Sequence, residues 1–225
     1  SLKYKSEIQH LFHIHFFPKF DLDKTIKGKP TIDKLNNAIT KLKKEDLTKF
    51  KVLHNYNLKG VGPSEATLYF LLDEAHLGGG ASAGMDIVVG SQGYEVKAGD
   101  ISMGFFKNFK LGGTVDVSKM VSAGLKIRDM NPKIKQMATE KTGVSGKQIE
   151  AIMKDRSLAP MWKKEVEGPY IKAAHSYLSK NPLILMINKT PAAKMGECCY
   201  IGKPSLNQVA LDVITQGTIK PKIKI

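Results

Sequence analysis

The chain has 225 residues, of which 42% are hydrophobic and 25% charged, so it can fold around a core of its own without disulfides or a structural metal. Its 35 Lys and Arg against 21 Asp and Glu give a net charge of +14, which favours a polyanionic partner such as nucleic acid over a basic surface that serves solubility alone. No apolar run approaches the ~20 residues that span a membrane. The two cysteines, Cys198 and Cys199, are adjacent and lack the Cys-x-x-Cys spacing of a zinc site. We expect no membrane partner and a cytoplasmic location, in the host cytoplasm if the protein is phage-encoded.

Residues 1–60 form a first segment, which we expect to be a partly helical extension. Thr31 is suited to cap a helix from about residue 32 to residue 44, because the apolar residues that follow recur on one helical face. Residues 61–225 are expected to form the core domain, with a helical insertion at about 115–180.

A second helix is expected to begin at Gly62 and Pro63. Glycine can serve as an N-cap, and proline is favoured at the first helical position because its missing N–H would be unpaired there. This helix would carry Glu65 and extend to His76. The three glycines Gly78–Gly80 would end it.

Two short β-branched segments follow, residues 85–89 and 94–98, and the intervening Gly90–Gly93 indicates a hairpin. The fold class expected is mixed α/β, with a central mixed sheet flanked by helices. The remaining predicted elements are helices at about 117–130, 145–153, 169–180 and 205–215, strands at 182–187 and 197–201, and an edge strand at 219–225.

The hairpin brings charged residues onto one face. If its turn has an even number of residues, Asp86, Glu95 and Lys97 share a face, and a two-residue turn can pair Asp86 with Lys97. A three-residue turn would point Asp86 the other way. Charges gathered on short apolar strands are costly without a counter-charge or a metal. The alternative is a surface hairpin whose Glu95 and Lys97 face solvent while Ile87 and Val96 point inward.

This pattern resembles the PD-(D/E)XK nuclease superfamily, which includes restriction endonucleases, phage-type exonucleases and Holliday-junction resolvases. Asp86 is followed nine positions later by Glu95-Val96-Lys97, and Glu65 lies on the preceding helix. The order of helix, Gly/Ser-rich loop and two strands is most similar to the resolvase-like members. The resemblance covers roughly residues 61–100, and Met85 replaces the proline that names the motif.

The resemblance implies a restriction-endonuclease-like core with added helices and a centre that binds Mg²⁺, with Mn²⁺ able to substitute. It implies that Asp86, Glu95 and the Val96 carbonyl hold the ion, with Glu65 as a further acidic member, and that Lys97 positions the attacking water. The expected activity is hydrolysis of DNA phosphodiester bonds, as an endonuclease in restriction, phage DNA processing or junction resolution. One-metal and two-metal mechanisms both stay open. A homodimer is a further expectation, because cutting both strands takes two centres.

Four other residues are candidate DNA contacts: Ser82, in a Gly/Ser-rich loop that is either a phosphate-contacting loop or a plain connector, and Lys107, Lys110 and Lys119 after the second strand of the hairpin. The main alternative to a nuclease is a non-catalytic DNA-binding or virion-associated protein on the same fold.

Overall fold

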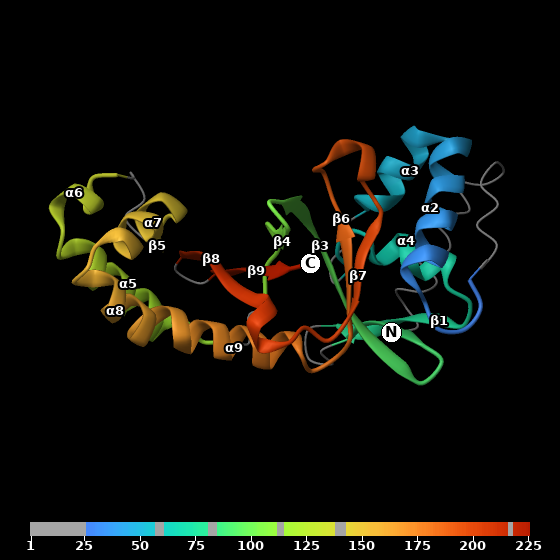
Figure 1. Ribbon diagram of the computed structural model, residues 1–225. Coiled ribbons are helices and arrows are strands. Elements are labelled where there is room, and N and C mark those ends of the chain that lie inside the picture. Colours follow the sequence, from blue (N-terminus) through green and yellow to red (C-terminus); the bar gives the residue numbers. More distant parts are fainter. Residues whose placement is uncertain (1–25, 57–60, 81–84, 112–114, 138–142, 216–217) are drawn as a thin grey trace. The chain divides into compact units, whose positions relative to one another are not determined.

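The structure is a computed structural model that describes residues 26–56, 61–80, 85–111, 115–137, 143–215 and 218–225. The chain is a mixed α/β protein, as expected, and it divides into two compact units (Figure 1). Unit 1 takes in the chain as far as Ile101 together with Lys180–Lys203, and unit 2 comprises Ser102–Ser179 and Pro204–Ile225. No helix of the described residues has the length and apolar character needed to cross a membrane.

Unit 1 is built on a mixed sheet, whose described strands run in the order β1-β2-β3-β6-β7. All neighbours are antiparallel except β3 and β6, which are parallel. The strands are β1 (Ala75–Gly80), β2 (Met85–Val89), β3 (Gln92–Ser102), β6 (Leu183–Ile187) and β7 (Cys198–Gly202). Strand β6 has five fully or almost fully buried residues, as expected for a strand covered on both faces.

Three helices belong to the same unit: α2 (Ile32–Glu45), α3 (Leu47–His54) and α4 (Glu65–Leu71). The predicted cap of α2 is confirmed, because the Thr31 side chain accepts the Lys34 N–H. Asp46 ends α2 and caps α3, since its carboxylate accepts the Lys49 N–H at 2.9 Å. The short Ala192–Lys194 3-10 helix lies between β6 and β7.

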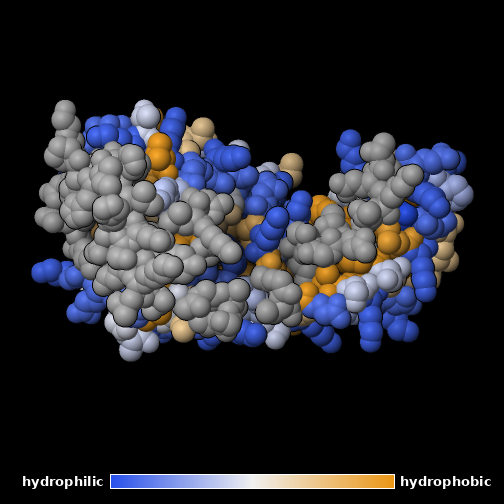
Figure 2. All heavy atoms as spheres, turned by 180° about the vertical axis from the view of Figure 1, so that it is seen from behind, coloured by the Kyte–Doolittle hydropathy of each residue, from blue (hydrophilic) through white to orange (hydrophobic). Residues whose placement is uncertain are grey.

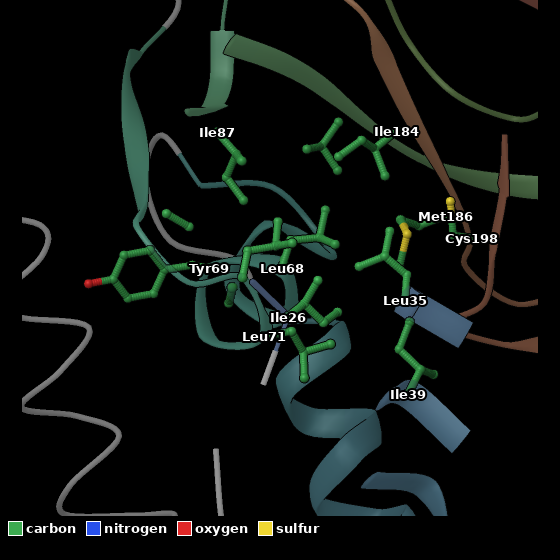
Figure 3. Close-up of a cluster of buried hydrophobic side chains, with 14 of the residues drawn as sticks. Ile26, Leu35, Ile39, Leu68, Tyr69, Leu71, Ile87, Ile184, Met186 and Cys198 are labelled. Carbon is green, nitrogen blue, oxygen red and sulfur yellow. The ribbon is translucent and has the colours of Figure 1, made fainter. Parts of the chain in front are cut away.

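These helices and strands share one hydrophobic core (Figure 3). Leu35 of α2 lies against Met186 of β6, and Leu68 of α4 lies below Ile87 of β2. The helices from the first 60 residues therefore contribute to the same core as the hairpin. The boundary expected at residue 60 does not coincide with the division between the two units, whereas the helical insertion expected at about 115–180 falls largely within unit 2.

The hairpin of β2 and β3 is confirmed, but its turn lies one residue earlier than the pairing of Asp86 with Lys97 requires. Val89 pairs with Gln92 and Ile87 with Tyr94, so the two-residue turn is Gly90-Ser91, and Gly90 has a φ of +58°. Because the turn has an even number of residues, Asp86, Glu95 and Lys97 still lie on one face of the hairpin, as predicted. The residues next to the Ile87–Tyr94 pair are Asp86 and Glu95.

Helix α4 is shorter than predicted. It begins at Glu65 after the N-cap Ser64, and it ends at Leu71, before a stretch that pairs with Ile26. His76 and the following glycines form β1 instead of a helix end. The glycines suit a strand here because a Cβ on Gly78 would lie only 1.8 Å from the Met85 carbonyl oxygen on β2.

Unit 2 has a sheet whose described strands are ordered β4-β9-β8-β5, all antiparallel, with a set of helices. The strands are β4 (Phe105–Lys107), β5 (Gly143–Val144), β8 (Val209–Thr215) and β9 (Thr218–Lys224). The helices are α5 (Ser118–Asp129), α6 (Pro132–Lys135), α7 (Gly146–Lys154), α8 (Leu158–Trp162), the π-helical Lys163–Glu167 and α9 (Gly168–Leu178). The capping box predicted for α7 is present, formed by Ser145 and Gln148.

Two predictions fail at the C-terminal end. The helix expected at 205–215 is a 3-10 turn, Leu206–Gln208, followed by strand β8, because the β-branched residues from Val209 pair with β9. The strand expected at 219–225 is present but is not an edge, since β9 pairs with β8 on one side and β4 on the other. Pro221 lies next to the register shift in β8, where a missing N–H is tolerated.

Candidate active site

The four predicted catalytic residues all lie in unit 1, on three neighbouring elements. Glu65 is the first residue of α4, Asp86 is on β2, and Glu95 and Lys97 are on β3. Asp86 and Glu95 adjoin the buried Ile87–Tyr94 pair, so they point to the other face of the hairpin. The charges of Asp86, Glu95 and Lys97 all act on Glu65, which shows that the four side chains form one electrostatic cluster.

Glu65 is buried, with 8% of its surface exposed, and its carboxylate bends back toward the preceding turn. Its Oε1 accepts the Gly62 N–H at 2.8 Å. A Cβ at position 62 would lie 2.7 Å from that oxygen, so only glycine leaves room for the carboxylate in this position. Gly62 lies two residues before the N-cap Ser64, so this bond ties the chain that leads into α4 to the first residue of the helix.

The Asp86 side chain is hydrogen-bonded to the neighbouring strand β3. Its Oδ2 accepts the Val96 N–H at 2.8 Å, which fixes the carboxylate beside β3. The resemblance assigns metal binding to the Val96 carbonyl, and that role stays a prediction. The contact that the structure shows is made by the N–H of the same residue.

Lys97 forms an ion pair with Glu95, with Nζ and Oε1 separated by 2.5 Å. The side chains of Lys97 and Glu95 are only 15% and 9% exposed, respectively. The interpretation as a surface hairpin with both residues in solvent is therefore wrong. Ile87 and Val96 do point into the core, as that interpretation assumed, but the opposite face is covered as well.

Burial and nearby like charges disfavour the ionised forms of Glu65 and Asp86. Burial raises the pKa of Glu65 to about 8, and the Asp86 charge adds to this, whereas the Gly62 N–H and Lys97 lower it. Burial is also the main cause that raises the pKa of Asp86. The Lys97 charge lowers this pKa, and the Glu95 charge raises it further. Three carboxylates and one ammonium carry a formal charge of −2 when all are ionised. Because the pKa of Glu65 is about 8, this full charge is not reached at pH 7.

A divalent cation fits the chemistry of this donor set. Carboxylate oxygens are the ligands that Mg²⁺ and Mn²⁺ prefer, and Mg²⁺ commonly binds through one or two carboxylates with water completing its shell. A charge of +2 would also offset the charge of the acids. Asp86 and Glu95 would hold the ion. Among the described residues, no three His, Cys, Asp or Glu side chains are arranged as a ready metal cage. The oxygens named above instead contact Gly62, Val96 and Lys97.

Of the four candidate DNA contacts, the three lysines belong to unit 2, whereas the acidic cluster belongs to unit 1. Ser82 lies outside the described residues. Lys107 is half-buried on β4, Lys110 is exposed in the segment that follows, and Lys119 is exposed on α5, all three in unit 2.

Sequence reasoning missed two features that hold Glu65. The first is the bond from the Gly62 N–H, whose only signal in the sequence is that Gly62 stands three residues before Glu65. The second feature is a buried contact between His54 of α3 and Ser64. No local pattern indicates it, since it depends on how α3 packs against the start of α4.

The fold and the cluster together define a mixed α/β protein with a buried acidic centre and one lysine. Comparisons with models of protein families, with curated proteins and with solved structures find no match to this chain. Its function must therefore be inferred from the geometry and charge of the centre and from the charge of the whole chain.

Proposed function

We propose that the protein is a Mg²⁺-dependent deoxyribonuclease whose catalytic centre consists of Glu65, Asp86, Glu95 and Lys97. The observation that carries the proposal is the cluster itself: three acids and an amine, from one helix and two adjacent strands, gathered where burial and mutual repulsion raise the pKa of two of the acids. Perturbed pKa values of this kind concentrate at functional sites.

Each side chain has a task in phosphodiester hydrolysis. Asp86, fixed by the Val96 N–H, and Glu95, paired with Lys97, supply the oxygen ligands. The ammonium of Lys97 can donate hydrogen bonds to a water or a phosphate oxygen and hold it beside the ligands. A bound Mg²⁺ supplies Lewis acidity toward the phosphate and lowers the pKa of water. Glu65, with its pKa near 8, can hold or release a proton at the edge of the centre.

The charge of the chain supports a polyanionic substrate. Unit 2 contains 17 Lys and Arg against 8 Asp and Glu, a net charge of +9, and unit 1 contains 18 against 13, or +5. Figure 2 shows many hydrophilic side chains among the coloured residues of this face, together with hydrophobic areas. Lysines that neutralise phosphates release counterions, which favours binding to DNA. Endonucleolytic cutting, the restriction-endonuclease-like core and a homodimer are finer parts of the same proposal.

The proposal is tested by incubating the protein with plasmid and branched DNA in Mg²⁺, in Mn²⁺ and in EDTA. We expect cutting that depends on the metal, and a loss of at least about 100-fold in Asp86→Asn and Lys97→Ala. Thr67→Val is the matched control, because Thr67 is fully buried on the same helix as Glu65 and its hydroxyl has no hydrogen-bond partner among the described residues.

Two results would count against the nuclease. If Asp86→Asn and Lys97→Ala cut DNA as fast as the wild type, the catalytic centre is misassigned. If the wild-type protein binds DNA in all three buffers but cuts it in none, the non-catalytic DNA-binding protein replaces the nuclease.

A further inference from the structure

His54 is a titratable residue that is fully buried in unit 1. It is the last residue of α3, and its ring stacks on Phe50 with a centroid distance of 5.7 Å and an interplanar angle of 16°. Burial lowers the pKa of His54 to about 4, so the ring is neutral near pH 7. A neutral imidazole that is held in this way can make a hydrogen bond of fixed direction.

Ser64 contacts His54 and is itself constrained. It is fully buried and has a φ of +73°, a left-handed conformation that is uncommon for residues other than glycine. Its N–H donates to the His54 carbonyl oxygen at 2.8 Å, and its Oγ lies 3.3 Å from His54 Nδ1. Such a conformation persists where the surroundings hold it, and here the same histidine contacts both the backbone and the side chain of the serine.

The constraint on Ser64 acts directly on Glu65. Ser64 is the N-cap of α4, and its carbonyl oxygen accepts the Leu68 N–H at 3.0 Å. Glu65 follows at once, and its carboxylate returns to the Gly62 N–H. The backbone conformation of Ser64 therefore determines the position of the Glu65 Cα and Cβ atoms, and with them the direction of the Glu65 side chain.

We infer that His54 and Ser64 form a positioning pair, which holds the first turn of α4 so that the Glu65 carboxylate stays at the acidic centre. The pair acts through Glu65, the residue that follows Ser64 in the chain. The inference rests on the proposed function for the importance of Glu65, but the position of the carboxylate can be measured without any activity.

Three variants separate the contributions. His54→Phe keeps a ring that can stack on Phe50 and removes both ring nitrogens, so the hydrogen bond with the Ile187 backbone is lost as well. Ser64→Gly keeps the left-handed backbone, which glycine adopts freely, and removes the hydroxyl. Thr67→Val, on the same helix, alters a buried hydroxyl that has no hydrogen-bond partner among the described residues.

The first measurement is amide hydrogen exchange at Gly62, in full-length protein with EDTA. We expect exchange at this amide to become about tenfold faster in His54→Phe and Ser64→Gly, because the hydrogen bond to Glu65 Oε1 opens more often. Thr67→Val should match the wild type. Unchanged exchange in both variants would overturn the inference, and so would an equal increase in Thr67→Val, which would indicate a general loosening of α4. Should His54→Phe not fold, Ser64→Gly decides the question.

The second measurement is the Mg²⁺ concentration that gives half-maximal cleavage. Residues that orient the acidic groups of a metal centre typically contribute 10- to 100-fold to metal affinity or activity, so we expect a rise of at least about tenfold in both variants. An unchanged Mg²⁺ requirement, despite faster exchange at Gly62, would overturn the link to the centre. If the wild-type protein does not cleave DNA at all, the proposed function fails, while the exchange at Gly62 still decides whether the pair holds Glu65.

Discussion

Glu65 connects the stability of the protein to pH. Its pKa is raised from the ordinary value of 4.5 to about 8, so the folded protein binds this proton more tightly than the unfolded chain does. The stabilisation is fully present below about pH 4.5 and is lost as the pH rises through about 8. In EDTA, we predict that the melting temperature of the wild type falls over this range relative to Glu65→Gln.

The upper limit of this effect is about 5 kcal/mol, since the shift from 4.5 to about 8 spans about 3.5 units and each unit is worth about 1.4 kcal/mol. Thermal melts at pH 5 and pH 8.5 would measure it. Parallel pH dependence in the wild type and Glu65→Gln would show that Glu65 titrates normally. Added Mg²⁺ should stabilise the wild type more at the higher pH, because metal binding competes with protons.

Gly62 gives a second prediction on the same carboxylate. In Gly62→Ala the new Cβ would lie 2.7 Å from Glu65 Oε1, so the carboxylate has to leave its present position. We expect cleavage to fall at least about tenfold with little change in melting temperature, because the clash is with the mobile end of the Glu65 side chain and not with backbone. Gly146→Ala is the matched control, because a Cβ there has nothing within 4 Å. Equal activity of the two variants would contradict the role given to the Gly62 turn.

Among the elements, those with strong local signals were predictable. The hairpin followed from its glycine-rich turn and β-branched strands, and α7 followed from the Ser145–Gln148 capping box. The register of the hairpin was not predictable, because the four residues Gly90–Gly93 can place a two-residue turn at more than one position. The shared face of Asp86 and Glu95 is the same in either register, since moving the turn by one residue changes the pairing by an even number of residues.

Other elements depend on contacts that are distant in the sequence. Gly78–Gly80 favour a helix end locally, but the pairing of β1 with β2 makes them a strand. Val209–Thr215 could form either a helix or a strand, and pairing with β9 decides it. For the site, the residue types and the shared face were predictable. The contact between His54 and Ser64 was not, because it arises from the packing of α3 against the start of α4.

The close approach of β1 to β2 gives a prediction at the scale of elements. A Cβ at position 78 would lie 1.8 Å from the Met85 carbonyl oxygen, a backbone atom next to Asp86. Gly78→Ala should therefore separate the two strands, lower the melting temperature by several degrees and reduce cleavage. Circular dichroism melts and the plasmid assay would check this. If Gly78→Ala is as stable and active as Gly146→Ala, the close pairing of β1 with β2 is incorrect.

At the scale of the whole molecule, the net charge of +9 in unit 2 predicts that this unit binds the DNA backbone. Lys119 and Lys126 are exposed on α5 and are seven residues apart, which places them on the same helical face. Lys119→Glu with Lys126→Glu should weaken DNA binding. The slope of log affinity against log salt should decrease by about one for each phosphate that the variant no longer neutralises.

Binding is best measured in the Asp86→Asn background with EDTA, so that cleavage does not interfere. Lys41→Glu is a useful control, because Lys41 is an exposed lysine of unit 1 and each such substitution changes the net charge by the same amount. A doubled Lys41→Glu and Lys44→Glu variant matches the total charge change. If it weakens binding as much as the α5 variant does, net charge alone governs binding, and α5 is not a specific contact surface.

The central claim is that the acidic cluster of unit 1 binds a divalent cation. The most direct test is a crystal of the wild-type protein soaked with Mn²⁺ and measured for anomalous scattering. We predict a peak bonded to carboxylate oxygens of Asp86 and Glu95, near Glu65 and Lys97, and its absence from Asp86→Asn crystals. Mn²⁺ bound elsewhere on the chain, with this cluster empty in a protein that cuts DNA, would contradict the claim.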